Sequence, residues 1–517
     1  MNPDQIAADE MAPEEAPRGG LTTKVVKGSF WTLAGQVAPL VVSFVTARLV
    51  IGMLGDKGYG VLVWVSLIPT YFLFGDFGMG IASTKFASQA FADGDPEKEA
   101  RIVRTTAFVA LLSSLPFAIA MFAFSTWIAR YFEVREEFLA DASLGLKLAA
   151  ITFVVNFMNT IFNTPQLTRL RMDLNTFVTS GFRMLGMIAT PVVLYLGFGI
   201  PAAAGVLLGA SLLTLAGHLY ISGRLLPQLF ALTLEREQMR TLLKFGGAFV
   251  GAGLAGTVLV NAEKGILAKT VSTDALGYYS IAFTVAAIVP MFSVAMIQSL
   301  IPAFSQLQGK EDLGRLNALF SRGLRLNMIV TVPALVVLAI VAKTFLALWL
   351  KDENFVRESP RPLYLLLCGI AFSVLAHFPY ASILAAGRTD IFAKLYWIQL
   401  VLYVPLVWLL TTKFGIAGAA AAWSIRGIVD TFCLFVIAKN VAGVSFRVQR
   451  VGRFCMTILV MALPLALYFY LGELDIWVAA ATLVALSIYA LLVWRWVLER
   501  EELIWLAERL RLPFISR

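Results

Sequence analysis

Long apolar stretches alternate with short polar ones along almost the whole chain. From about residue 28 onward, fourteen of these stretches approach or exceed the roughly 20 apolar residues that a helix needs to cross a bilayer. The pattern therefore predicts an all-α polytopic membrane protein with about fourteen transmembrane helices. The expected helices lie near residues 28–52, 59–83, 103–128, 143–165, 176–197, 200–222, 245–270, 277–303, 324–348, 363–386, 391–411, 415–438, 453–472 and 475–497.

The second half of the chain repeats the order of turn and helix-breaking residues found in the first half. Similarity at a nearly constant spacing indicates an internal duplication, which in membrane chains is typical of transporters built from two related bundles. The matched residues lie 214 to 219 positions apart: Gly58–Tyr59 with Gly277–Tyr278, Gly94 with Gly309, Pro116 with Pro333, Pro165 with Pro379, Arg171 and Asp173 with Arg388 and Asp390, and Phe198–Gly199–Ile200 with Phe414–Gly415–Ile416.

The duplication predicts a division into two six-helix lobes. We expect an N-lobe over residues 24–243 and a C-lobe over residues 244–440, followed by two added helices within residues 441–498. Because six is an even number of crossings, both lobes should cross the membrane in the same sense.

The two ends of the chain differ from the apolar middle. Residues 1–23 begin with an acidic, proline-containing segment that predicts a disordered tail and lacks the basic start of a cleavable signal peptide. Residues 499–517 alternate charges with leucines, which predicts an amphipathic cytoplasmic segment. Of the 42 lysines and arginines, 29 fall on the side of the two termini, 12 fall on the other side, and Arg426 lies in mid-helix, so both termini should be cytoplasmic.

Composition supports the membrane class and removes other classes. The chain is 59% hydrophobic and 15% charged, with a mean hydropathy of +0.79. Cys368, Cys433 and Cys455 all lie in apolar stretches, so neither a disulfide framework nor a cysteine metal site is expected. The net charge of +9 is spread between apolar helices, so it favours a membrane orientation signal over nucleic-acid binding.

The two six-helix halves carry short motifs that resemble one family. A Gly-Tyr pair follows the first helix of each half, and Phe77-Gly78-Met79-Gly80 closes the second helix. The chain resembles a polysaccharide-export flippase of the Wzx type, in the multidrug/oligosaccharidyl-lipid/polysaccharide (MOP) exporter superfamily, over roughly residues 24–440. The resemblance implies that the protein moves a polyprenyl-diphosphate-linked oligosaccharide across a bacterial inner membrane for surface or exopolysaccharide biosynthesis.

Ionisable residues inside membrane helices are expensive and therefore point to function or to pairing. Arg426 and Asp430 are four residues apart, so they share one face about halfway along the twelfth helix. Arg426 could face a central cationic cavity and bind a diphosphate or an acidic sugar, with Asp430 holding it. A self-neutralising pair that serves helix packing explains the same spacing equally well.

Further candidates lie toward the outer ends of the first and seventh helices. Arg48, Glu263, Lys264 and Lys269 could form a basic vestibule for the departing diphosphate. Lysine and arginine near helix ends also reach toward the headgroups, and this explanation is the stronger one for Arg48 or Lys269 taken singly.

Neutral polar residues and inner-side charges complete the candidate set. Asn156, Asn159 and Asn163 lie on one stripe of the fourth helix, which fits either sugar binding or packing between helices. A gate toward the cytoplasm, or ordinary solvated placement, would account for three more charged residues, namely Asp76, Lys85 and Arg183.

No catalytic or cofactor motif occurs in the sequence, and no metal site is expected. Without a phosphate-binding loop, transport would draw on a proton or sodium gradient, the membrane potential or removal of the product. Expected partners are the lipid-linked oligosaccharide, membrane lipids and a polysaccharide polymerase with its export machinery. Two alternatives stay open, namely a cation-coupled drug or metabolite exporter of the same superfamily and a membrane polysaccharide polymerase or ligase.

Overall fold

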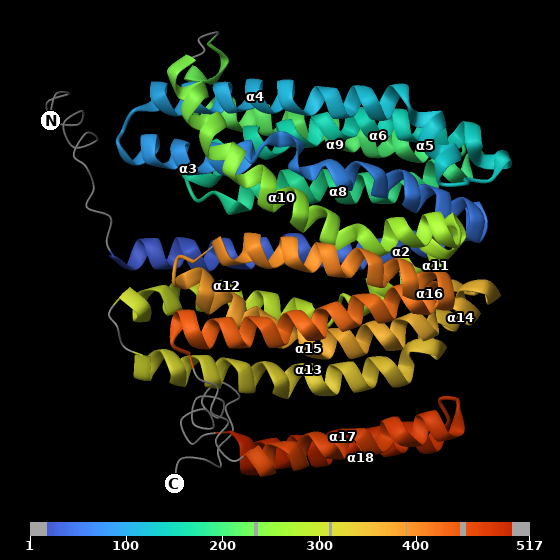
Figure 1. The fold of residues 1–517 in the computed structure, drawn as a ribbon. Helices are drawn as coiled ribbons and strands as arrows, with labels where there is room; N and C mark the ends of the chain where they lie inside the picture. Colours follow the sequence, from blue (N-terminus) through green and yellow to red (C-terminus); the bar gives the residue numbers. More distant parts are fainter. Residues whose placement is uncertain (1–17, 232–235, 310–312, 389, 445–450, 499–517) are drawn as a thin grey trace, which may run out of the picture.

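The computed structural model describes residues 18–231, 236–309, 313–388, 390–444 and 451–498. Within these ranges every regular element is a helix and none is a strand. The helices lie side by side along one common direction (Figure 1). The predicted acidic tail up to residue 17 and the amphipathic segment 499–517 lie outside the described residues.

The first half of the chain consists of helices joined by short turns. Its elements are α2 (Arg18–Leu67), η1 (Ile68–Asp76), α3 (Met79–Ala92), α4 (Pro96–Ala123), α5 (Ser125–Tyr131), α6 (Glu136–Phe162), α7 (Thr164–Thr168), α8 (Met172–Tyr195), α9 (Ile200–Leu225) and η2 (Pro227–Phe230).

The second half follows the same plan and then adds a helical hairpin. Its elements are α10 (Arg236–Thr270), α11 (Thr273–Ala286), α12 (Pro290–Gly309), α13 (Leu313–Leu350), α14 (Glu353–Glu358), α15 (Pro360–Ala385), α16 (Asp390–Ala442), α17 (Val451–Leu471), α18 (Ile476–Leu492) and η3 (Val493–Val497).

The predicted class, an all-α multi-pass membrane protein, is confirmed. Among the described residues, nine helices are long and apolar enough to cross a bilayer, or ten if the bent pair α11–α12 counts as one span. Two of the long helices contain a turn at a glycine in the left-handed region, Gly55 of α2 and Gly415 of α16. Each therefore joins two of the predicted helices, and the total of fourteen crossings stays a prediction.

Some helices begin or end at residues other than those predicted from the apolar stretches, because capping interactions set their ends. The third predicted helix starts at Pro96 rather than near residue 103, because the Asp95 carboxylate accepts the Lys98 N–H and proline suits the first helical position. It also breaks at Phe124, between α4 and α5. Hydropathy reports where a helix is buried in lipid, whereas caps decide where it begins.

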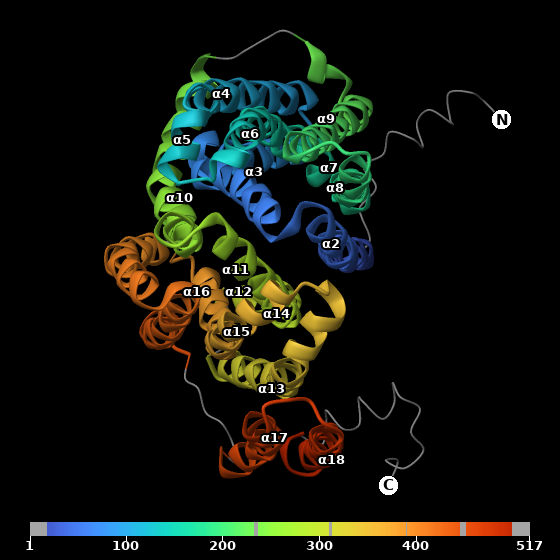
Figure 2. The same cartoon turned by 90° about the vertical axis from the view of Figure 1, so that its right-hand side faces the viewer.

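The helices form two groups, α3–α9 and α11–α16, with α2 and α10 running between them (Figures 1 and 2). Their hydrophobic cores interlock at the boundary. Leu276 of α11 belongs to the core that surrounds Trp64 and Leu146, and Ile51 of α2 belongs to the core that surrounds Tyr279. The predicted boundary at residues 243/244 falls inside α10, and the division into lobes stays a prediction.

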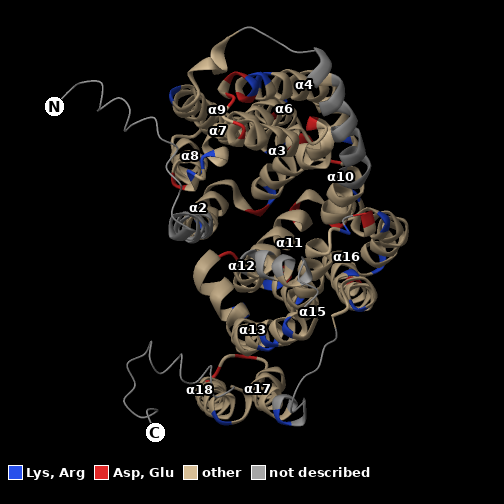
Figure 3. Cartoon of the chain, turned by 90° about the vertical axis from the view of Figure 1, so that its left-hand side faces the viewer, with Lys and Arg blue, Asp and Glu red and all other residues tan. Residues whose placement is uncertain are grey.

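The hairpin α17–α18 stands beside α13 and away from the other helices (Figure 2). Tyr489 donates a hydrogen bond to the Ile329 carbonyl, and the hydroxyls of Tyr364 and Tyr468 lie 2.8 Å apart. Viewed from the end where α2 begins, the ribbon is mostly uncharged, with Lys, Arg, Asp and Glu in short stretches (Figure 3). We call this the near end; the far end is opposite, where α5 leads into α6 (Figure 1).

Candidate functional site

The second helix of the first half is broken in its middle. It changes from α2 to the 3-10 helix η1, then passes through Phe77 and Gly78, both with φ in the left-handed region, before α3 begins. A non-glycine residue with positive φ is costly, which makes the Phe77 conformation a strained position that the surrounding structure must hold. The Asp76 carboxylate accepts the N–H groups of Gly78 at 2.8 Å and Gly80 at 3.2 Å.

A cavity of about 760 Å³ opens beside this break. Polar residues are part of its lining, and three of the lining residues, Ile81, Lys85 and Thr160, are exposed. Its position between the break and the near-end parts of α6 and α7 places it in the half of the molecule toward the near end. The lining residues are Leu73, Phe74, Asp76, Gly78, Gly80, Ile81, Thr84, Lys85, Phe157, Thr160, Asn163, Leu167 and Thr257.

Asn163 gives the cavity wall an unused hydrogen-bond acceptor. Its Nδ2 donates to Asn175 Oδ1 at 3.2 Å, while its Oδ1 is buried and has no hydrogen-bond partner among the described residues. A buried polar atom without a partner is unfavourable, so this position favours a hydroxyl or amide donor from a ligand or from water. Nearby, Ser83 and Thr164 hydrogen-bond at 2.9 Å and join α3 to α7.

The other two asparagines of the predicted stripe do not line this cavity. Asn159 is buried, and its Nδ2 contacts the Ser211 carbonyl at 3.2 Å and Asn156 Oδ1 at 3.5 Å. Asn156 is exposed. Of the three predicted gate residues, Asp76 and Lys85 border the cavity, whereas Arg183 is exposed on α8 and is not part of the lining.

The second half contains a compact group of charged and tyrosine side chains around Glu263. This carboxylate is fully buried, and it accepts hydrogen bonds from Tyr279 at 3.5 Å and Tyr403 at 3.2 Å. Lys264 donates to Asn261 Oδ1 at 3.2 Å, and its ammonium lies 4.8 Å from the centre of the Phe283 ring. The Glu263 carboxylate therefore has hydrogen-bond donors within this group.

Arg426 and Asp430 have different partners in the structure. The Arg426 guanidinium lies 5.1 Å from the centre of the Tyr403 ring, and its buried Nε has no hydrogen-bond partner among the described residues. Asp430 accepts a hydrogen bond of 2.5 Å from Gln399, which is itself buried. No ion pair joins Arg426 to Asp430, and neither borders the 760 Å³ cavity.

The charges expected to form a basic vestibule are bound separately. Lys269 donates to Glu133 Oε1 at 2.7 Å and to the Tyr131 carbonyl at 2.6 Å, so it ties α10 to the turn before α6. Arg48 is exposed on α2. Within the described residues, no hydrogen bond or ion pair links Arg48, Lys264 and Lys269 to one another.

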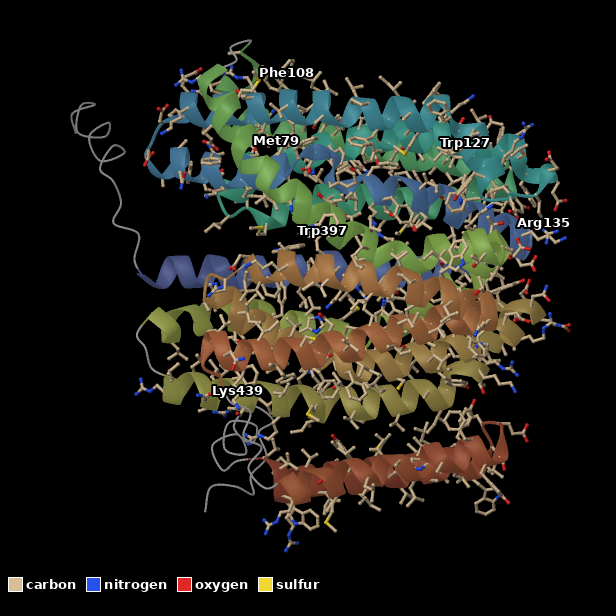
Figure 4. The ribbon with its side chains drawn as sticks, viewed as in Figure 1. Met79, Phe108, Trp127, Arg135, Trp397 and Lys439 are labelled. Atoms are coloured by element: carbon tan, nitrogen blue, oxygen red, sulfur yellow. The ribbon has the colours of Figure 1, made fainter. Side chains whose placement is uncertain are left out.

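The two halves are joined by polar contacts at the far end, where Figure 4 labels Arg135. Arg135 forms an ion pair with Asp274 at 2.8 Å, and the hydrogen bond and charge of that aspartate raise the pKa of the Arg135 guanidinium. Reciprocally, Asp56 of the first half accepts hydrogen bonds from Tyr278 at 2.6 Å and Asn354 at 3.0 Å.

Two glycines, Gly60 in the first half and Gly277 in the second, allow the halves to touch at this end. A Cβ on Gly60 would collide with the Thr273 carbonyl, and one on Gly277 would lie 3.2 Å from the Gly60 Cα. The helices that precede the two breaks therefore meet backbone to backbone. Glycine at these positions is needed for close approach, since neither residue has a positive φ.

Several partners in these groups were not predicted from sequence. Tyr71 donates a 2.6 Å hydrogen bond to the Asn261 carbonyl. Tyr403 donates to the buried Glu263 carboxylate, and Gln399 donates to the Asp430 carboxylate. Gln399 is a lone amide in a long apolar stretch, which is a signal that a search for intramembrane polar residues would have found. Tyrosine carries no comparable signal, because it is common in membrane helices for other reasons.

Comparison with known proteins gives one family match and several similar chains. The model of the family described as polysaccharide biosynthesis protein matches residues 36–353. A Shigella flexneri protein whose name describes it as an O-antigen transporter is 22% identical over 417 residues, covering 79% of this chain and 96% of the relative. The lipopolysaccharide biosynthesis protein WzxC of Escherichia coli K12 is 27% identical over 208 residues, covering 40% of this chain and 41% of the relative.

Solved structures share the fold at low sequence identity. The lipid II flippase MurJ in an inward closed conformation has a TM-score of 0.63 at 14% identity, covering 86% of this chain and 97% of that one. An inward-facing multidrug resistance transporter of the MATE family in the MOP superfamily has a TM-score of 0.60 at 14% identity, covering 80% and 94%. Together with the family match, this fold confirms the resemblance to Wzx-type exporters of the MOP superfamily, and the chain belongs to the polysaccharide biosynthesis protein family.

Proposed function

We propose that the protein is a flippase of the cytoplasmic membrane that moves a polyprenyl-diphosphate-linked oligosaccharide from the inner to the outer leaflet. The observation that carries this proposal is a partly polar cavity in the near-end half of a bundle whose halves are joined at the far end. A substrate cavity on one side of a closed contact is what an alternating-access transporter needs. With the near end cytoplasmic, as the distribution of Lys and Arg favours, this arrangement admits a substrate from the inside.

The cavity wall suits a carbohydrate head group. Phe74 and Phe157 contribute aromatic side chains to the lining, and Thr84, Thr160 and Asn163 contribute neutral hydrogen-bonding groups. Sugar hydroxyls lose water when they enter the membrane, so each needs a replacement partner. Lys85 adds a cation on the same wall, which favours an anionic diphosphate or acidic sugar.

The drug-exporter alternative receives less support from these walls. Cation-coupled efflux of hydrophobic cations favours an acidic cavity. Here the one lining carboxylate, Asp76, already accepts two backbone hydrogen bonds, and the lining also carries the positive charge of Lys85, so the cavity is not acidic. A drug-resistance assay with overexpressed protein tests the alternative directly. Energised efflux of cationic dyes would favour it over the flippase.

The main test is the leaflet distribution of the lipid-linked oligosaccharide. Deletion of the gene should leave the complete lipid-linked unit in the inner leaflet and remove the surface polysaccharide. Unchanged leaflet distribution and unchanged polysaccharide would contradict the proposal.

A substitution in the cavity sharpens this test. Asn163→Leu removes the unused acceptor and fills space, so flipping should fall by roughly tenfold, the value of about one hydrogen bond to a polar ligand. Thr152→Leu is the matched control on α6, because the Thr152 hydroxyl bonds only its own helix at Leu148 and does not line the cavity. Equal activity of the two variants would show that Asn163 is not part of the substrate site.

Arg426 is a second candidate for the diphosphate, independent of the cavity wall. If it binds the anion, Arg426→Ala should abolish flipping at a normal protein level, and Arg426→Lys should retain part of it. Because Asp430 hydrogen-bonds to Gln399 and not to Arg426, we do not expect the double change Arg426→Leu with Asp430→Leu to restore transport. A fully active double variant would show that Arg426 serves only to balance charge.

A further inference from the structure

The second half has a break in its own second helix, between α11 and α12, and an apolar groove lies beside this break. The first half breaks after Leu67 at η1, and the second half breaks after Ala286, before Pro290, with a bend of 54° between α11 and α12. The groove measures about 410 Å³. Its lining residues are Val285, Ile288, Val289, Phe292, Val330, Thr331, Ala334, Val337, Leu338, Val341 and Phe345.

The lining offers nothing to a polar ligand. Its one polar side chain is Thr331, whose hydroxyl already donates to the Asn327 carbonyl at 2.9 Å. Ile288, Phe292 and Val330 are each about two-fifths exposed, so the groove is open along one side. An occupant must therefore be a hydrocarbon.

The shape and position of the groove favour a chain that lies along the helices. From Val330 to Phe345 the groove follows α13 for about 22 Å at 1.5 Å per residue, which is most of the ~30 Å hydrocarbon thickness. At its far-end limit Phe345 packs against Phe44 of α2, with ring centres 6.1 Å apart, and Trp349 donates to the Phe44 carbonyl at 2.7 Å. The groove therefore ends at the seam between the two halves.

We propose that this groove binds the polyprenyl chain of the same lipid whose head group enters the polar cavity. The inference rests on the proposed function and adds a second site to it. The two repeat-related breaks then serve the two parts of one amphiphile: the polar break takes the head, and the apolar break takes the tail. A groove that ends at the seam keeps the tail in contact with the protein while the head is between the halves.

The groove selects its ligand by shape rather than by hydrophobicity. Lipid tails are as apolar as valine or leucine side chains, so moving a tail from bilayer to groove gains only packing contacts. Methyl-branched isoprene units differ in shape from straight acyl chains, and the branched valines of α13 provide a matching surface. The expected preference is therefore modest.

A photoreactive polyprenyl phosphate in vesicles of phosphatidylethanolamine and phosphatidylglycerol tests the site. Label should appear on α12 and α13, and unlabelled polyprenyl phosphate should compete with it more strongly than excess phosphatidylcholine does. Ala334→Phe fills the groove and should lower labelling roughly fivefold, in keeping with the loss of packing contacts alone. Ala347→Phe is the matched control, because Ala347 is exposed on the same helix outside the groove.

Flipping assays separate this inference from the proposed function. Ala334→Phe should slow flipping of the full-length substrate roughly fivefold and leave a short-tailed analogue unaffected. Normal flipping and labelling in Ala334→Phe, or equal competition by phosphatidylcholine, would overturn the groove and leave the flippase intact. Selective labelling without any flipping by the native protein would instead overturn the flippase and leave the groove as a polyprenyl site.

Discussion

The second helices of the two halves are both broken, but the residues around the two breaks differ in polarity. Both are interrupted, one between Leu67 and Met79 and the other between Ala286 and Pro290. Beside the first break lie Asp76, Lys85 and Asn163, whereas the second is bordered almost entirely by valine, leucine, isoleucine and phenylalanine. The two breaks therefore have similar places in the predicted repeat but differ in the polarity of the residues beside them.

The breaks are also built differently. The first needs two consecutive left-handed residues, Phe77 and Gly78, and it lies against α6 and α7. The second has no residue with positive φ among residues 286–290 and lies against α13. The break in the first half is therefore strained and has polar neighbours, whereas the break in the second half is unstrained and has apolar neighbours. This difference is consistent with one head-group site and one tail site.

The largest effect is expected where the two broken helices touch. Gly60→Leu collides with the Thr273 carbonyl and should keep the far end from closing, with a cost of roughly 3 kcal/mol and a fall in flipping of about 100-fold. Gly52→Leu on the same helix meets nothing within 4 Å and should flip normally. In a Thr160→Cys reporter, Gly60→Leu should also raise labelling by an impermeant maleimide from outside. Wild-type flipping by Gly60→Leu would refute the contact as a seal.

A charge placed at each break tests their opposite polarity. Val289→Lys puts an ammonium at the apolar break and should cost about 3 kcal/mol, so the steady-state protein level falls several-fold. Thr84→Lys places the same group on the polar cavity wall, where it should change stability by less than about 1 kcal/mol. Thermal denaturation in detergent measures both, and equal destabilisation would remove the distinction between the two breaks.

Loss of the cation from the polar break should have a smaller effect. Lys85→Leu should lower flipping roughly tenfold, because a charge-assisted contact to an anionic head is lost. Lys85→Arg should retain most activity. The measurement is the initial flipping rate in reconstituted vesicles; an active leucine variant would argue for a neutral head group.

The smallest expected effect concerns the backbone of the first break. Gly78→Ala adds a side chain at φ 67° and should destabilise the protein by about 1 kcal/mol. Gly181→Ala in α8 has no neighbour within 4 Å and no positive φ, so it should be neutral or stabilising by roughly 0.5 kcal/mol. Opposite signs in the two denaturation midpoints would support strain at the break, and equal signs would not.

Some features of the site followed from sequence through local physics. Pro69 and Pro290 stand at the breaks of the two helices, where proline cannot donate a hydrogen bond to the preceding turn. The Arg-x-Asp pairs also form in both halves, with Arg171 and Arg388 each 3.0 Å from the aspartate two residues on. Contacts over two residues depend on little beyond the sequence itself.

Other features required neighbours that lie far away in the chain. Arg426 and Asp430 have the spacing of a pair, yet Asp430 bonds to Gln399, 31 residues earlier. Only Asn163 of the asparagine stripe borders the cavity, because the cavity meets α6 along the neighbouring face of Phe157 and Thr160, whereas Asn159 is turned toward the Ser211 carbonyl of α9. A helical stripe defines which residues share a face, but it does not define what that face meets.

The sequence by itself determined the class of protein and the helical spans as apolar stretches, and it predicted the duplication, because hydropathy and proline or glycine placement act within one helix. Only the tertiary structure decided which break became polar space, which became an apolar groove, and that the halves meet at Gly60 and Gly277. In a membrane every helix is apolar outside, so hydrophobicity does not specify which helices pack together. Close backbone approach and a few distant hydrogen bonds make that choice.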